Sequence, residues 1–336
     1  MQRHAALDEK LYRLQTGREI VTSKINLAFN STVKIARRSL ALLLALSCFW
    51  TLAARGEPGA VQKIAPGVYV WQGDRDKREP ANCMWVIFKD YVVVVDANFP
   101  WATKEILGKI KGTTDKPIRY VLNTHYHGDH AYGNSAFVDA GATIVTSEAT
   151  DSEARTKGVD GWAKWNNPEH TLTGYRQEFA TITFSDEMVI DDGTQRIEFI
   201  RLGPAHSKGD SVAYLPKQRI VATGDLCVTW GFGNNLGDPN GSYSGWMKAL
   251  NKMIGWNVAT VVPGHGAVSG PDALRAQRAY LNGMLTQVQA GRSAGKTADQ
   301  LATEIDLRSF GFIASDPPSN ATSVRAMFHR LETNGD

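Results

Sequence analysis

Residues 124–130 read Thr-His-Tyr-His-Gly-Asp-His, and this stretch decides how the rest of the chain is interpreted. The apolar and β-branched residues 118–122 just before it predict a strand. Alternate residues of an extended segment face the same side, and Gly128 permits a bend, so the polar side chains are expected to converge. Four such groups exceed what an open catalytic site on one metal needs. The candidate ligands are His125, His127, Asp129 and His130.

Three later motifs complete the set of candidate metal ligands. They are Gly203-Pro204-Ala205-His206, Thr223-Gly224-Asp225 and Val262-Pro263-Gly264-His265-Gly266. Each motif ends a β-rich run and contains glycine or proline, as expected where a strand passes into a loop. Imidazole and carboxylate donors suit zinc, although iron and manganese also accept them. Five histidines and two aspartates predict two metals that share one carboxylate.

Other polar residues near these motifs receive different predictions. Asp96 is expected to hydrogen-bond a ligand histidine and so orient it, with the capping of a loop as the alternative. Tyr132 and Asn134 are expected either to contact substrate or to belong to a solvated loop. Cys227 lies two residues beyond Asp225, but the carboxylate already occupies the ligand position, so Cys227 is not predicted to bind metal. The histidines outside the motifs are expected to be packed or solvated; they are His4, His170 and His329.

The strand and helix patterns predict an α/β fold. Residues 91–96, Tyr-Val-Val-Val-Val-Asp, are apolar on both faces and indicate a buried central strand, joined to residues 84–88 by a hairpin at Lys89-Asp90. Further strands are expected at 68–71, 143–146, 196–201, 211–215, 219–223 and 259–262. Helices are expected at 103–110, 246–254, 271–290, 297–305 and 321–331. Two sheets covered outside by helices, a four-layer αββα sandwich, accommodate this order.

Two segments, 150–176 and 229–243, are rich in Trp, Gly and Asn and fit neither a strand nor a helix. Long loops of this kind often cover a functional site. Four aromatic residues of these segments are expected either to form the apolar wall of a substrate pocket or to pack in the core; they are Trp162, Trp165, Trp230 and Phe232.

The first 55 residues have the layout of a secretory signal. Basic residues at 34–38 precede an apolar run at 40–54, whose 15 residues are shorter than the roughly 20 that span a bilayer. We therefore expect a cleaved leader at 1–55, a periplasmic or secreted protein, and membrane contact only through an uncleaved leader. Residues 56–336 are expected to form one domain with C-terminal helices from about residue 271.

Charge and cysteine content exclude some classes of protein. The first 55 residues hold nine Lys and Arg against three Asp and Glu, a net charge of +6, which leaves −3 for the remainder of a chain whose total is +3. Nucleic-acid binding, which needs a basic face, is therefore not expected. Cys83 and Cys227 lie in apolar, strand-like runs and are predicted to be buried free thiols, although an oxidising compartment would allow them to pair.

The seven-ligand pattern resembles that of the metallo-β-lactamase superfamily over residues 61–270. The resemblance implies that His125, His127 and His206 hold a first metal, that Asp129, His130 and His265 hold a second, and that Asp225 bridges them. It also implies hydrolysis by a hydroxide between the metals, with Asp129 as the catalytic residue that orients the hydroxide. Two zinc ions per chain and a small-molecule acyl substrate are the expected cofactor and partner.

The sequence departs from true β-lactamases at Asp225, where those enzymes usually carry cysteine or serine. An aspartate at this position makes the ligand pattern more similar to that of glyoxalase II, lactonases and related hydrolases. Export and the aromatic loops, by contrast, make the chain more similar to a periplasmic β-lactamase. The bond cleaved is therefore left open among a β-lactam amide, a lactone and an ester. The alternative is a non-lactamase component of an exported pathway, with metal-dependent binding or slow hydrolysis. A nuclease is disfavoured because no inserted extra domain is apparent.

Overall fold

A computed structural model describes residues 56–166, 172–229, 236, 238–307 and 317–333. Chain contacts divide the protein into two units, Met1–Arg55 and Gly56–Asp336, and every described residue belongs to the second. The expected leader therefore lies outside the described residues. Among the described helices, none combines the length and the apolar character needed to cross a bilayer.

The first sheet has seven strands in the order in which they occur along the chain. The first four strands are antiparallel neighbours, and the last four are parallel. Its strands are β1 Val61–Ala65, β2 Val68–Trp71, β3 Cys83–Ile87, β4 Val92–Val95, β5 Ile118–Leu122, β6 Thr143–Ser147 and β7 Ile182–Phe184. The hairpin predicted at Lys89-Asp90 is confirmed, since β3 and β4 pair antiparallel across it.

The second sheet has five strands in the order β12-β11-β10-β9-β8. Its strands are β8 Glu187–Asp191, β9 Arg196–Arg201, β10 Ser211–Leu215, β11 Ile220–Ala222 and β12 Thr260–Val262. Only the β11–β12 pair is parallel. Both of these strands therefore deliver the residues that follow them to the same edge of the sheet.

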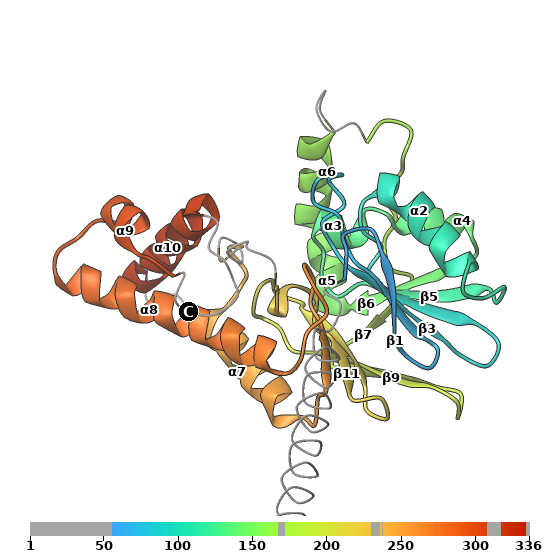
Figure 1. The fold of residues 1–336 in the computed structure, drawn as a ribbon. Helices are drawn as coiled ribbons and strands as arrows, with labels where there is room; N and C mark the ends of the chain where they lie inside the picture. Colours follow the sequence, from blue (N-terminus) through green and yellow to red (C-terminus); the bar gives the residue numbers. More distant parts are fainter. Residues whose placement is uncertain (1–55, 167–171, 230–235, 237, 308–316, 334–336) are drawn as a thin grey trace, which may run out of the picture. The chain divides into compact units, whose positions relative to one another are not determined.

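Alternation along β4 shows how the layers are built. Val93 faces the second sheet and packs in one buried cluster with Phe199 of β9, whereas Val94 faces outward and packs with Ile106 of α2 (Pro100–Lys111). Because side chains of a strand alternate, an all-valine strand can fill both cores at once. Figure 1 shows α2 and α4 (Asn134–Asp139) beside this sheet.

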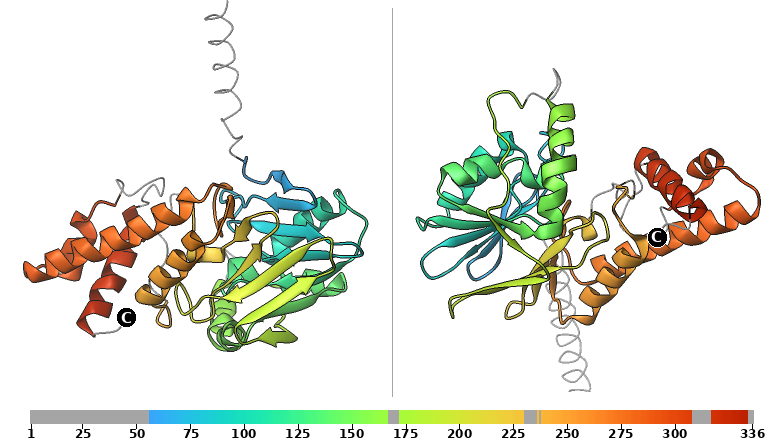
Figure 2. Two further views of the ribbon diagram at one scale, coloured as in Figure 1. Left: turned by 90° about the horizontal axis from the view of Figure 1, so that it is seen from below. Right: turned by 180° about the vertical axis from the view of Figure 1, so that it is seen from behind.

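The outer face of the second sheet is covered by the helices of the C-terminal half. Val212 of β10 packs in a third buried cluster with Trp246 of α7 (Tyr243–Gly255) and Tyr280 of α8 (Asp272–Ser293). The cluster extends to α9 (Ala298–Glu304) and α10 (Pro317–Glu332). Figure 2 shows the two sheets face to face from two further directions. The predicted αββα sandwich is confirmed.

The prediction for one long loop is wrong. Residues 150–176 were expected to lack regular structure, but residues 150–165 are helical, in α5 (Glu148–Glu153), the π-helical turn Ala154–Gly158 and α6 (Val159–Trp165). The Ser147 hydroxyl accepts a hydrogen bond from the Thr150 amide and caps this helical run, a local signal that the Gly- and Trp-rich composition obscures. The strands β1, β7 and β8 were also not predicted.

Candidate metal centre

All seven predicted ligands meet at one edge of the sandwich. His125 follows β5, and His127 precedes the short helix α3 (Gly128–Ala131), which carries the next two ligands. His206 lies between β9 and β10, Asp225 lies in a 3₁₀ turn after β11, and His265 follows β12. The convergence is confirmed, and the chain bends at Gly128 as expected. Asp129 was expected in an extended segment, but it lies in the first turn of α3.

The first cluster comprises three histidines and one carboxylate. Nδ1 of His127 lies 3.0 Å from Nε2 of His125 and 3.0 Å from Nε2 of His206. Oδ2 of Asp225 lies 3.5 Å from His206 Nε2 and 4.0 Å from His125 Nε2. Donors held at zinc bond lengths in a tetrahedron are separated by about 3.3 Å. These four side chains therefore have the spacing and the chemistry to hold a transition metal.

The second cluster comprises Asp129, His130 and His265, and each of these residues offers one donor atom. Nε2 of His265 lies 3.3 Å from Asp129 Oδ2 and 3.4 Å from His130 Nε2. Oδ1 of Asp225 adds a further donor, 3.1 Å from His265 Nε2 and 3.3 Å from His130 Nε2. This cluster also fits a metal, again by spacing and donor type.

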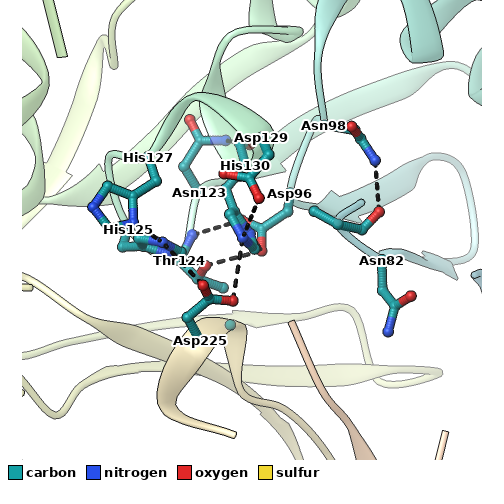
Figure 3. Close-up of polar contacts among 12 residues, drawn as sticks. Asn82, Asp96, Asn98, Asn123, Thr124, His125, His127, Asp129, His130 and Asp225 are labelled. Carbon is teal, nitrogen blue, oxygen red and sulfur yellow. Dashed lines mark hydrogen bonds and ion pairs between the residues drawn. The ribbon is translucent and has the colours of Figure 1, made fainter. Parts of the chain in front are cut away.

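Asp225 joins the two clusters, since each of its carboxylate oxygens faces a different one (Figure 3). Two glycines allow this carboxylate to approach. Gly224 has a φ of +49°, which favours glycine, and a Cβ on Gly264 would lie 2.1 Å from Asp225 Oδ1. The glycine of the Pro-Gly-His motif therefore leaves the space that the aspartate of the Thr-Gly-Asp motif occupies.

Asp96 organises the loop that carries the first ligands. One of its oxygens lies 2.9 Å from Nδ1 of His130 and accepts a hydrogen bond from the Thr124 hydroxyl, and the other accepts from the Thr124 amide (Figure 3). The Thr124 hydroxyl in turn lies 3.1 Å from Nδ1 of His125. Asp96 therefore contacts His130 directly, as predicted, and reaches His125 of the other cluster through Thr124. It adopts a left-handed conformation, with φ +63°.

The two clusters differ in electrostatics. In the first, burial and neighbouring imidazoles lower the pKa of His206 to about 4 and also lower that of His125. In the second, burial lowers the pKa of His130, but the Asp129 and Asp225 carboxylates raise it more, so that the net pKa lies above its ordinary value. His125 and His206 therefore present neutral imidazoles that can donate lone pairs to a metal.

Other predicted residues have different positions. Asn134 is buried, exchanges hydrogen bonds with the Asn123 side chain and lines a small cavity together with it. His329 is on α10 beside Glu332, outside the clusters, whereas His4 and His170 lie outside the described residues. Cys83 and Cys227 are buried free thiols, as predicted, and burial raises the pKa of both.

A pocket of about 450 Å³ opens beside the clusters. Its lining includes His127, Asp129, Tyr132, Lys157 and Trp165. The Trp165 ring packs 4.8 Å from that of Phe99, which also lines the pocket. The predicted aromatic wall is thus present at Trp165, while Trp162 packs behind it on Tyr132. Trp230 and Phe232 lie outside the described residues.

Sequence reasoning did not identify a second group of polar residues near the first cluster. Asp238 is buried, and Oδ2 of its carboxylate lies 3.6 Å from Nε2 of His127. The same carboxylate accepts hydrogen bonds from the Tyr126 hydroxyl and from Lys157 Nζ. Asp238 stands in Gly237-Asp238-Pro239-Asn240-Gly241, which looks like an ordinary surface turn, so no local signal distinguishes it.

Comparison with known sequences agrees with this geometry. The model of the metallo-β-lactamase superfamily matches residues 76–265. A type 2 metallo-β-lactamase from Bacillus sp. (strain 170) is 26% identical over 193 residues, which are 56% of this chain and 68% of that protein. A linear primary-alkylsulfatase from Pseudomonas sp. (strain ATCC 19151) is 23% identical over 248 residues, 61% of this chain and 46% of that protein.

Solved structures show the same fold. A metallo-β-lactamase from Pontibacter korlensis has a TM-score of 0.55 and 24% identity, over 66% of this chain and 98% of that one. A stereoselective inverting sec-alkylsulfatase from Pseudomonas sp. has a TM-score of 0.64 and 17% identity, over 81% of this chain and 50% of that one. Because the family model matches more than half of the chain, the protein belongs to the metallo-β-lactamase superfamily of metal-dependent hydrolases.

Proposed function

We propose that the protein is a dinuclear zinc hydrolase that cleaves a carboxylic acyl bond, in a β-lactam, a lactone or an ester. The observation that carries this proposal is the position of Asp225. Its two oxygens lie 3.5 Å from a donor of the first cluster and 3.1 Å from a donor of the second. A carboxylate shared in this way suits two cations about 3.5–4 Å apart, the separation of two-metal hydrolytic sites.

The metals, when bound, would activate water as a nucleophile and polarise the carbonyl of the substrate. Asp129 is the ligand best placed to act on that water. Its side chain is 21% exposed and lines the pocket, whereas that of His130 beside it is fully buried. We therefore assign Asp129 to orient the attacking water and to hold its proton at a carboxylate oxygen.

The pocket favours a small substrate with an apolar or aromatic group. Its volume of about 450 Å³ falls within the usual range of small-molecule sites. Phe99 and Trp165 form an aromatic surface on one side, and the charged groups of the lining include Lys157, Asp160 and Lys164. Aromatic side chains stabilise flat apolar groups by stacking. An acyl or leaving group of that kind would lie against Trp165, with its scissile bond toward Asp129.

A sulfate ester is the second candidate for the bond cleaved. The alkylsulfatase structure aligns with 81% of this chain, against 66% for the β-lactamase structure. The larger alignment therefore takes in more of the chain. An alkyl sulfate therefore belongs in any substrate screen.

The test is a hydrolysis screen on the purified, zinc-loaded protein. A chromogenic cephalosporin, a lactone, an aryl ester and an alkyl sulfate are assayed side by side with Asp129→Asn and with Asp139→Asn as a matched control. Asp139 has an exposed carboxylate that pairs with Arg176, and it belongs to neither cluster. We expect Asp129→Asn to lower kcat by about 10²-fold or more, and the control to leave kcat unchanged.

Each outcome of the screen has a separate meaning. Lactam, lactone or ester turnover that Asp129→Asn abolishes supports the acyl-hydrolase proposal. Turnover of the alkyl sulfate alone contradicts the acyl-hydrolase proposal and supports an alkylsulfatase. Metal binding without turnover of any substrate contradicts both, and supports a component that binds rather than hydrolyses.

Export and metal identity are proposed on separate grounds. Export rests on the basic residues and apolar run in residues 34–54. The N-terminal sequence of protein released from the periplasm of a bacterial host tests it, and retention in the cytoplasm would contradict it. Zinc rests on the donor types, and elemental analysis of protein purified without added metal tests it.

A further inference from the structure

The polar group around Asp238 connects the first cluster to the C-terminal helix. His127 directs Nδ1 toward the other histidines of its cluster, 3.0 Å from each, and leaves Nε2 on the opposite side of the ring. That second nitrogen faces Asp238 Oδ2 at 3.6 Å. At this distance the two groups lie close enough to interact electrostatically but are too far apart for a hydrogen bond. His127 thus lies between its cluster and a carboxylate.

Asp238 is held by further partners that leave it little freedom. The Tyr126 hydroxyl donates to Oδ2 at 2.6 Å, and Lys157 Nζ and the Asn240 amide donate to Oδ1 at 2.7 and 2.8 Å. The side chain of Asp238 is only 2% exposed. A buried carboxylate with this many donors is stabilised in its charged form and keeps one orientation.

Glu153 of α5 connects the loop that carries Asp238 to the segment that carries His206. Its Oε1 accepts from Lys157 and from the Asn240 side chain, and its Oε2 accepts from the Lys208 amide, two residues beyond His206. Two ligand-bearing segments of the first cluster therefore share one set of polar contacts.

The loop is also bound from the other end of the chain. Arg330, in the last turn of α10, donates to the carbonyl oxygens of Leu236, Asp238 and Gly241 at 3.3, 2.5 and 2.6 Å. A guanidinium has several donors in a rigid plane, so one side chain can hold three carbonyls of a turn. The helix itself is anchored by Asn320, which accepts from the Tyr280 hydroxyl of α8 at 2.6 Å.

We propose that Asp238 is a positioning residue for the metal ligand His127, and that Arg330 of the C-terminal helix keeps Asp238 in place. The inference rests on the proposed function only in taking the first cluster as a metal site. A carboxylate behind a ligand histidine fixes the tautomer and the ring orientation and makes the donor nitrogen more basic. The C-terminal helices thereby contribute to the metal site as well as to the outer layer of the sandwich.

The test measures metal binding directly, so that it does not depend on activity. Stepwise zinc dissociation constants are obtained by competition with a chromophoric chelator for wild type, Asp238→Asn and Arg330→Ala. Asp238→Asn keeps the shape of the side chain and removes its charge. We expect it to weaken one of the two binding steps about 10–100-fold and to leave the other within about threefold. Arg330→Ala should weaken the same step by a smaller factor.

The matched control is Arg325→Ala on the same helix. Arg325 is exposed and pairs with Asp299 of α9, so its loss should leave both steps unchanged. Arg330→Lys, which keeps the charge but not the planar donors, should fall between wild type and Arg330→Ala. The visible spectrum of the cobalt-substituted protein is a second readout, since it reports ligand geometry. It should change in Asp238→Asn and not in Arg325→Ala.

Three results would overturn the inference. They are wild-type zinc constants in Asp238→Asn, equal weakening of both steps together with a lower melting temperature of the chelator-treated protein, and a cobalt spectrum that does not respond. A wild-type protein that binds only one zinc would instead contradict the dinuclear proposal. The effect of Asp238→Asn on that single zinc would still decide the role of Asp238.

Discussion

The Asp96 carboxylate lies 2.9 Å from Nδ1 of His130, the nitrogen that faces away from the second cluster. This contact sets which nitrogen of the ring is free to bind a metal. Asp96 also holds the Thr124 amide and hydroxyl, so one side chain orients the whole ligand loop. It does so from a left-handed backbone conformation, with φ +63°, which aspartate and asparagine tolerate better than most residues.

Asp96→Asn therefore removes the charge without straining the backbone. We predict a loss of zinc affinity of about 10–100-fold at one of the two sites, because the imidazole becomes a weaker and less well oriented donor. Chelator competition measures it, with Asp139→Asn as the control. Unchanged affinity would show that hydrogen bonding by either side chain is sufficient.

Gly264 offers a test in which no ligand is removed. A Cβ at this position would lie 2.1 Å from Asp225 Oδ1 and 2.7 Å from the backbone of Gly224. Gly264→Ala must displace the bridging carboxylate, so we predict that the protein retains fewer than two metals after dialysis.

The control for Gly264→Ala is Gly270→Ala, because a Cβ there meets nothing within 4 Å. Elemental analysis after dialysis should find the wild-type metal content in this variant. If both variants retain the same metal content, Asp225 does not require the space at Gly264.

Asp210 predicts how the stability of the chelator-treated protein depends on pH. Burial raises the pKa of this carboxyl to about 7, in spite of the hydrogen bonds that it accepts from the Ser207 amide and hydroxyl. Because the pKa of Asp210 is raised in the folded state, the protonated side chain favours folding. Its contribution to stability is complete below the ordinary pKa of 3.8 and is lost as the pH rises toward 7.

Asp210→Asn removes this titration. Relative to wild type, its free energy of unfolding should therefore improve between pH 4 and pH 8, because the wild-type protein alone has to bury a charge at the higher pH. Urea unfolding at several pH values, with the metals removed, measures the difference. A difference that does not change with pH would contradict the raised pKa.

The ligands were predictable from sequence because each motif joins a chemical signal to a strand end. Five histidines and two aspartates follow β-rich runs, and the ends of β5, β11 and β12 meet at one edge. The fold was predictable because β4 is apolar on both faces, which requires a layer on each side. Both inferences rest on short sequence patterns, and neither requires information about the rest of the chain.

Contacts between distant turns were not predictable. Asp238 acquires its significance from residues far away in sequence: His127, Lys157 and Arg330. The helical run at 148–165 was missed for a different reason. Its Gly and Trp residues have weak helix propensity, so the composition of this segment does not indicate a helix.

Trp165 gives the most direct test of the pocket. Its side chain is among the few large apolar groups that the described surface exposes, at 38%, and it packs on Phe99 beside the cavity. Trp165→Ala removes a stacking surface for the apolar group of the substrate. We predict that KM rises about 3–10-fold for an aryl ester, corresponding to roughly 0.5–1.5 kcal/mol of aromatic contact, and that kcat changes little.

The control for Trp165→Ala is Tyr175→Ala, since Tyr175 is 44% exposed and does not line the pocket. A comparison of an aryl ester with a methyl ester of the same acid separates stacking from general damage, because only the aryl compound can use the tryptophan. An equal rise in KM for both esters would mean that Trp165 shapes the site without contacting the substrate. A fall in kcat with KM unchanged would instead indicate that Trp165 acts on the ligands, through Phe99, which contacts its ring, and Tyr132, which packs against Phe99.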